Sequence, residues 1–238
     1  MRIPKLLHQT WKTADFPEKW SVFRDKMIML HPGWEYKLWT DEDNDEFVRR
    51  EFPDFYEIFA GFSLGIMRAD VIRYLLMYRL GGIYLDLDYE FLKPFDFEDA
   101  SLVLPQNRSR SRGDSVDSIG NAVFASVPGH EFWKDVIEDL KYNPPRVKDR
   151  TEVVGATGPH FLSRIYERKL YQDILVTDRM LFHPPSPRTE DEYLAIVNNG
   201  ISYGIHHGWG IWKKRYTPGY FLIKAKQVIE KIKRKPEL

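Results

Sequence analysis

One continuous segment constrains the fold of this chain more than any other. Residues 66–80 contain no glycine or proline and have the apolar pattern of a helix, which the glycine pair at 81–82 ends. Residues 83–85 then predict a short apolar strand, with Asp86 and Asp88 at its end. A helix that leads into a strand through a tight turn is a repeating unit of α/β proteins.

The rest of the chain alternates helix-like and strand-like segments. We expect strands at 5–11, 34–39, 101–104 and 122–126, and helices at 19–30, at 41–51, directly after Pro53 and at 130–142. Between two of these strands, residues 107–118 are rich in Arg, Ser and Asp and predict a loop. The alternation predicts an α/β fold whose mostly parallel central sheet is flanked by helices.

Composition limits the classes of protein to which the chain can belong. Its 238 residues suit one large domain, and its 35 basic and 35 acidic side chains cancel. Because a nucleic-acid-binding domain usually carries a basic excess, we expect no nucleic-acid partner. The absence of cysteine excludes disulfides and thiolate metal sites. With no apolar run typical of a signal peptide or a membrane span, we expect a cytoplasmic protein that contacts, at most, a membrane surface.

The C-terminal segment differs in character from the rest. Residues 213–235 hold nine basic side chains and one acidic side chain, Glu230. Apolar residues recur on one helical face of this segment, namely Phe221, Ala225, Val228, Ile229 and Ile232. We predict one domain over residues 1–217 and a basic amphipathic helix over 218–238. That helix is suited either to dock on the domain or to lie on an anionic membrane surface.

Asp86 and Asp88 are the first candidates for chemistry. Residues two apart on a strand point to the same side, and ligands of open α/β sheets bind beyond the carboxyl ends of the strands. Two carboxylates that face one space suit Mg²⁺ or Mn²⁺, which fill their remaining positions with water and substrate phosphates. The alternative is a pair of solvated turn acids. On the preceding helix, Asp70 and Arg73 lie one turn apart and share a face, as a surface ion pair also would.

These residues form part of a longer pattern. The run Ala69-Asp70-x-x-Arg73-Tyr74, followed by Gly81-Gly82-x-Tyr84-x-Asp86-x-Asp88, resembles glycosyltransferase family 32. That family includes yeast-type Golgi mannosyltransferases, bacterial capsule-building enzymes and, distantly, the glucosylating clostridial toxins. Further blocks agree in order, at residues 3–11, 121–130, 157–159 and 206–212. One departure is Ile211, where the closing block of the family often has Ser.

The resemblance implies a GT-A-type, Rossmann-like nucleotide-sugar-binding fold over residues 1–217. It also implies a retaining transfer of a hexose from a UDP- or GDP-linked sugar to a glycan or lipid-linked acceptor. Asp86, Asp88 and His206 are the implied ligands of Mn²⁺ or Mg²⁺, and Asp88 is the surer metal ligand of the two acids. Asp86 and Asp88 are also implied contacts to the ribose and diphosphate of the donor. His207 competes with His206 for this role, because strand alternation lets only one of the two face the site.

The resemblance implies further contacts to the donor. Asp70 and Arg73 would bind hydroxyls of the donor sugar, and Arg73 would also offset the charge of the departing diphosphate. Asn121 is the third catalytic candidate, which would stabilise the oxocarbenium-like sugar together with, or instead of, Asp70. Trp11 is a candidate for stacking on the nucleotide base, and Tyr84 for contact with the nucleotide or sugar.

Two other classes of function remain open on the sequence alone. A phosphohydrolase of the haloacid dehalogenase type also carries Asp-x-Asp at a strand end, with the first Asp as nucleophile, but usually near the N-terminus. A non-catalytic protein of the same fold would bind a sugar nucleotide without turnover, and Ile211 is the feature that favours it.

Overall fold

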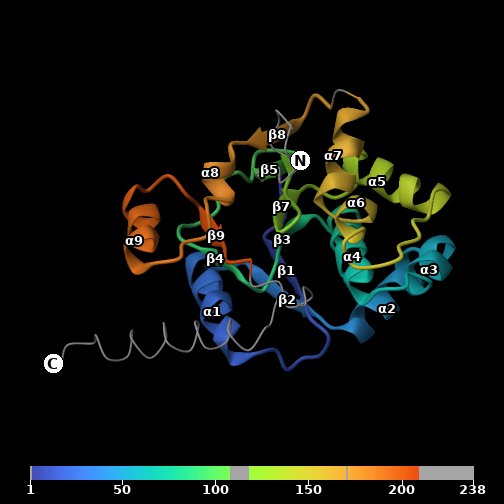
Figure 1. Ribbon diagram of the computed structural model, residues 1–238, viewed down its shortest axis with the longest axis horizontal. Coiled ribbons are helices and arrows are strands. Elements are labelled where there is room, and N and C mark those ends of the chain that lie inside the picture. Colours follow the sequence, from blue (N-terminus) through green and yellow to red (C-terminus); the bar gives the residue numbers. More distant parts are fainter. Residues whose placement is uncertain (1, 108–117, 170, 209–238) are drawn as a thin grey trace. The chain divides into compact units, whose positions relative to one another are not determined.

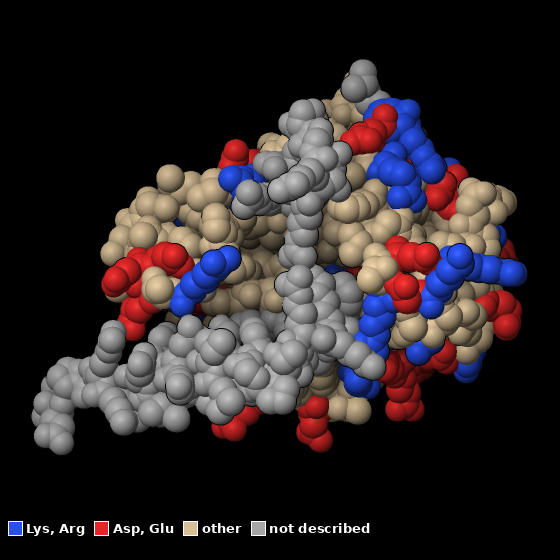
Figure 2. Space-filling model, viewed as in Figure 1, with Lys and Arg blue, Asp and Glu red and all other residues tan. Residues whose placement is uncertain are grey.

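The computed structural model describes residues 2–107, 118–169 and 171–208 (Figure 1). The expected amphipathic helix at 218–238, the domain boundary at 217 and Ile211 therefore lie outside the described residues, as does most of the loop expected at 107–118. On the face drawn in Figure 2, the described basic and acidic side chains are interspersed.

A seven-stranded sheet forms the centre of the described part of the chain. The strands run in the order β2-β1-β3-β7-β5-β6, and β8 pairs with β5. Their bounds are β1 Leu6–Thr10, β2 Glu35–Trp39, β3 Gly82–Leu85, β5 Leu102–Asn107, β6 Ser118–Ile119, β7 Val123–Ser126 and β8 Ile174–Thr177. Pairing is parallel between β1 and β2, β1 and β3, and β5 and β8, whereas β7 is antiparallel to both β3 and β5. The predicted α/β fold with a mostly parallel sheet is confirmed. Its exceptions are the reversed strand β7 and the two-residue strand β6, which pairs antiparallel with β5.

The helices agree closely with the sequence prediction as far as residue 142. Their bounds are α1 Ser21–Leu30, α2 Asp41–Glu51, α3 Pro53–Ala60, α4 Gly65–Arg79, α5 Glu131–Tyr142, α6 Val153–Ala156, α7 Pro159–Glu167, α8 Arg179–Phe182 and α9 Glu190–Asn198, with a 3₁₀ turn η1 at Glu18–Trp20. Thr40 caps α2 in a capping box with Asp43, as the polar residues before this helix predict. None of these helices, within the described ranges, is long and apolar enough to cross a bilayer.

The sheet separates two apolar cores, and strand alternation assigns neighbouring residues to opposite cores. Tyr84 and Phe124 pack with α2–α7 on one face, while Ile83, Leu85 and Val123 pack with α1 and α8 on the other. Figure 1 shows the same division, with α2 to α7 on one side of the strands and α1, α8 and α9 on the other. Helices cover both faces, so polar ligands have access at the ends of the strands.

The turn between α4 and β3 fixes the position of the site. Gly81 and Gly82 have φ angles of 66° and 90°, which residues with a side chain rarely adopt. A Cβ atom on Gly82 would also lie 2.6 Å from the carbonyl oxygen of Leu6. Two glycines are therefore required where α4 enters β3, and this tight entry brings the face of α4 that carries Arg73 beside the end of β3.

A second, small ladder completes the arrangement. β4 (Tyr89–Phe91) and β9 (Gly204–His206) pair antiparallel, with Tyr89 opposite His206. The sequence did not predict this ladder, since each strand has three residues. It brings the end of the described chain next to the two aspartates.

Candidate active site

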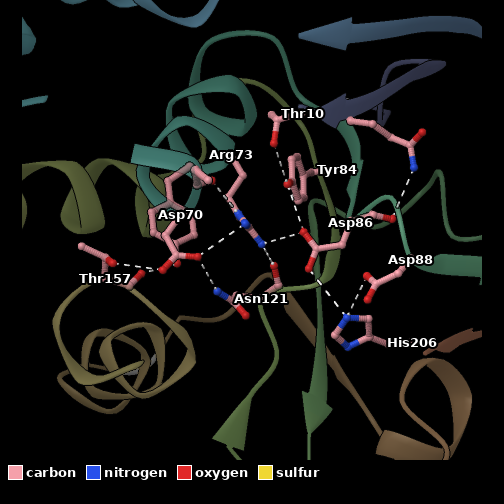
Figure 3. Close-up of polar contacts among 12 residues, drawn as sticks. Thr10, Asp70, Arg73, Tyr84, Asp86, Asp88, Asn121, Thr157 and His206 are labelled. Atoms are coloured by element: carbon pink, nitrogen blue, oxygen red, sulfur yellow. Dashed lines mark hydrogen bonds and ion pairs between the residues drawn. The ribbon is translucent and has the colours of Figure 1, made fainter. Parts of the chain in front are cut away.

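Asp86 and Asp88 lie in a turn rather than on a strand. β3 ends at Leu85, and the backbone N–H of Tyr89 donates to the carbonyl of Asp86 at 3.0 Å, which closes a β-turn. The expectation that strand alternation aligns the two carboxylates was wrong in its geometry. The turn nevertheless directs both carboxylates toward His206 (Figure 3).

His206 faces both acids from β9. Its Nε2 lies 3.2 Å from Asp88 Oδ1 and 3.8 Å from Asp86 Oδ2. Burial alone would lower the pKa of His206, but the hydrogen bond and charge of Asp88 raise it overall. One donor atom from each of the three side chains lies within 4.8 Å of the others. Two carboxylate oxygens and one imidazole nitrogen at this spacing fit the ligand preferences of Mn²⁺.

Arg73 joins the acids to the rest of the site. Its Nη1 lies 3.0 Å from Asp86 Oδ1 and donates to the backbone carbonyl of Asn121 at 2.6 Å, while Nη2 lies 3.4 Å from Asp70 Oδ1. The Arg73 side chain is only 5% exposed. Burial acts to lower its pKa, but the neighbouring Asp86, Tyr84 and Asp70 raise it, so the guanidinium remains charged.

Asp70 is held on both carboxylate oxygens. Asn121 Nδ2 donates to Oδ1 and Thr157 Oγ1 to Oδ2, each at 3.0 Å (Figure 3). Burial raises the pKa of Asp70 to about 6, against the opposing charge of Arg73. Asp70 is thus a carboxyl group that changes its protonation state close to neutral pH.

Tyr84 contacts the side chains of this site directly, whereas the contact described for Trp11 is with another tryptophan. Tyr84 is buried, and its OH donates to Asp86 Oδ1 at 3.1 Å and lies 3.3 Å from Thr10 Oγ1. The guanidinium of Arg73 lies 4.7 Å from the centre of the Tyr84 ring. Trp11 directly follows β1 and packs edge-on against Trp20, with 5.0 Å between ring centroids.

The two adjacent histidines point in different directions. His207 Nε2 lies 2.9 Å from Glu90 Oε2, and its ring stacks on Phe23 at 4.8 Å. His206, by contrast, lies between the acids and the ring of Tyr89, which stacks on it at 6.5 Å. The geometry therefore favours His206 over His207 for the third ligand position.

Sequence reasoning missed several residues that surround the site. Thr157 holds Asp70, Thr10 contacts Tyr84, and the buried His183 lies edge-on to His206 at 6.2 Å. Thr157 belongs to a block that the family resemblance marked, so that block was the available signal for it. A lone His183 between apolar residues carries no such signal.

Comparison with known proteins decides the family. Residues 17–109 match the family described as glycosyltransferase sugar-binding region containing DXD motif. The chain belongs to this family of DXD glycosyltransferases, of the family 32 type. The matched range includes both the Asp70–Arg73 pair and the Asp86–Asp88 turn, and the mostly parallel sheet with helices on both faces is the GT-A-type arrangement expected of a family member.

The relatives of this DXD-family chain include fungal mannosyltransferases. It is 40% identical over 167 residues to mannosyl phosphorylinositol ceramide synthase CSH1 of Saccharomyces cerevisiae, a match that covers 70% of this chain and 43% of that protein. It is 33% identical over 220 residues to inositol phosphoceramide mannosyltransferase 2 of Schizosaccharomyces pombe, a match that covers 90% of this chain and 62% of that protein. The chain thus spans about half the length of the relatives it matches. Among solved structures, the PaToxG glycosyltransferase aligns over 69% of each chain with a TM-score of 0.49 and 17% identity.

Proposed function

We propose that the chain is a metal-dependent, retaining hexosyltransferase that uses a nucleotide diphosphate sugar. The observation that carries this proposal is the continuity of the site. The acids and His206, which suit a divalent ion, are joined through Arg73 to Asp70 and Asn121, which offer hydrogen bonds to a sugar.

Asp86, Asp88 and His206 would hold the metal, with Mn²⁺ preferred to Mg²⁺ because one ligand is an imidazole nitrogen. A bound divalent ion would supply positive charge that neutralises the donor diphosphate. Arg73 keeps Asp86 oriented through its 3.0 Å contact, and its fixed charge is available to the departing diphosphate. Trp11 is the proposed contact to the nucleotide. The buried Tyr84, expected to contact the nucleotide or sugar, would instead act through Asp86, to which its OH donates.

Asp70 and Asn121 act on the sugar side of the site. Asn121 donates a hydrogen bond to Asp70, and Thr157 holds the other carboxylate oxygen of Asp70. The two side chains therefore have fixed orientations. Asp70 in its ionised form would stabilise positive charge that develops on the sugar ring. The acceptor hydroxyl would then attack from the face that the diphosphate leaves and would give its proton to an oxygen of the departing diphosphate, so the configuration is retained. Such a transfer depends on positioning and electrostatics more than on a strong base.

The names of the relatives guide the choice of substrates. The two fungal proteins are named for mannosyl transfer to phosphorylinositol ceramide. We infer that the hexose is mannose and that the acceptor is lipid-linked, with a glycan as the alternative. Contact of residues 218–238 with a membrane, and a cytoplasmic location, stay predictions, since that segment lies outside the described residues.

The phosphohydrolase alternative is not favoured. It would need Asp86 to attack through Oδ2 alone, because Arg73 and Tyr84 both engage Oδ1. Family membership also argues for a transferase. A non-catalytic sugar-nucleotide-binding protein is the remaining alternative, and only turnover distinguishes it.

The test is an incubation of the purified chain with a panel of UDP- and GDP-linked sugars and Mn²⁺, with and without EDTA. We expect free nucleotide diphosphate from one donor, stimulated by a lipid-linked acceptor and abolished by EDTA. Release of phosphate from a simple phosphomonoester would support the hydrolase instead. Donor binding without turnover over a range of acceptors would refute the proposed activity.

A further inference from the structure

Glu90 lies in a buried cluster beside the candidate metal site, and the mechanism above does not use it. Its side chain is 7% exposed. Three donors reach its carboxylate: Lys26 Nζ at 2.8 Å, Tyr193 OH at 2.8 Å and His207 Nε2 at 2.9 Å. An ionised carboxylate only accepts hydrogen bonds, so Nε2 of His207 is the donor in this pair.

The three donors come from separate parts of the chain. Lys26 lies on α1, Tyr193 on α9, and His207 directly after β9. Glu90, on β4, therefore ties both helices to the end of the last described strand. Removal of one partner from such a buried cluster leaves the charge or hydrogen-bonding group of the others without its partner, which is costly. The cluster therefore favours this one arrangement of α1, α9 and β9.

His207 is held in one orientation from three sides. In addition to the Glu90 contact, its ring lies flat on Phe23, with 4.8 Å between centroids and 5° between planes. Its backbone N–H donates to the carbonyl of Asp88 at 3.0 Å. The imidazole cannot turn toward the acids without the loss of both the stack on Phe23 and the hydrogen bond to Glu90.

This restraint has a consequence for the neighbouring residue. Adjacent residues at a strand end face opposite sides, so fixing His207 toward Glu90 turns His206 toward Asp86 and Asp88. The Nε2 atom of His206 then lies 3.2 Å from Asp88 Oδ1. The chain offers two consecutive imidazoles of the same chemistry, and nothing in the pair itself distinguishes one from the other.

We propose that Glu90 is a positioning residue that selects His206, rather than His207, as the histidine that faces the two aspartates. The inference rests on the proposed metal-dependent function, because it concerns the third ligand of that site. Mutation of a residue that hydrogen-bonds a metal ligand commonly changes metal affinity about 10- to 100-fold. Because Glu90 acts on His206 only through the adjacent His207, we expect an effect at the lower end of that range.

The test compares Mn²⁺ affinity in the full chain, measured by electron paramagnetic resonance of free Mn²⁺, for the wild type and Glu90→Gln. The chain offers a matched control in Asp135, which accepts from Lys169 at 2.7 Å and from Tyr171 at 2.6 Å but from no histidine. We expect Glu90→Gln to weaken Mn²⁺ binding by about tenfold or more and Asp135→Asn to leave it within about twofold.

A second measurement identifies the histidine directly. With ¹⁵N-labelled histidine, Mn²⁺ should broaden the imidazole signals of His206 most strongly in the wild type, and those of both histidines comparably in Glu90→Gln. If Glu90→Gln does not fold, Phe23→Leu removes the stack on His207 and should shift affinity and broadening in the same direction. Unchanged affinity and unchanged broadening in a folded variant would overturn the inference. A wild type that binds no Mn²⁺ would overturn the proposed metal-dependent function as well. Failure of the positioning role alone is thus distinguishable from failure of the metal site.

Discussion

Among the described residues of the site, Arg73 is the cation that faces both the buried Asp70 and the half-buried Asp86, and its removal tests the electrostatics directly. We predict that Arg73→Met lowers the free energy of unfolding by about 3–5 kcal/mol at pH 8, because breaking a buried ion pair leaves an uncompensated charge. The methionine keeps much of the apolar stem, so lost packing contributes little. The loss of unfolding free energy should therefore be mainly electrostatic, and it should depend on pH.

The sign of the pH dependence follows from Asp70. Its pKa is raised to about 6 even with Arg73 beside it, and loss of the cation raises it further. The native variant then holds a proton that the unfolded chain, with a carboxyl pKa near 4, has released, so stability falls as pH rises. The slope is at most about 1.4 kcal/mol per pH unit for one carboxyl, and the wild type also loses a little stability near pH 6. The difference in unfolding free energy between variant and wild type should therefore grow by up to about 2 kcal/mol from pH 6 to pH 8.

Urea unfolding followed by tryptophan fluorescence, in EDTA at pH 6, 7 and 8, measures this difference. Arg79→Met is the matched control on the same helix, since Arg79 is 57% exposed and pairs with Glu51 at the surface. We expect the control to lose less than about 1 kcal/mol at every pH. A loss for Arg73→Met that equals the control, or that is the same at pH 6 and pH 8, would refute the reasoning.

Three further predictions concern the metal and the turn. Asp88→Asn should abolish Mn²⁺-dependent release of nucleotide diphosphate while the circular dichroism spectrum stays unchanged; full activity would contradict the metal site. Because an ion that binds only the folded state stabilises it, the melting temperature of the wild type in Mn²⁺ should fall when EDTA is added, and an unchanged value would argue against binding. Gly82→Ala should lower the free energy of unfolding in urea by more than about 2 kcal/mol, because the added Cβ meets Leu6. Gly129→Ala is the control: Gly129 has a φ of 73° but open space around it, so the loss should be only about 1–2 kcal/mol. Equal losses would count against the close approach of Gly82 to Leu6.

The part of the site that is local in sequence was predictable from the residues. Asp70, Arg73 and Asp86 belong to one helix-turn-strand unit, and helical spacing with a tight glycine turn is enough to bring them together. The turn that carries Asp88 was mistaken for a strand, because a β-turn of four residues leaves no periodicity to read.

The distant parts of the site depend on pairings that no local pattern encodes. Asn121 reaches Asp70 because β7 inserts antiparallel between β3 and β5, a choice that strand composition does not determine. His206 arrives through a ladder of three residue pairs. Both were named through the family resemblance, which carries information on tertiary contacts that periodicity lacks. Glu90 was passed over because a single acid after the motif looks like a solvated residue until its three donors are known.

The β4–β9 ladder also bears on how the protein is made. Glu90 and His207 are 117 residues apart in the chain, so the contact between them is of very high sequence separation. Contacts of this kind form late, because a long loop must close before they are gained. During synthesis from the N-terminus, the two aspartates therefore emerge well before His206 does. A nascent chain that stops before residue 206 would lack the third ligand of the proposed ion site, so Mn²⁺ affinity should report whether the ladder is complete.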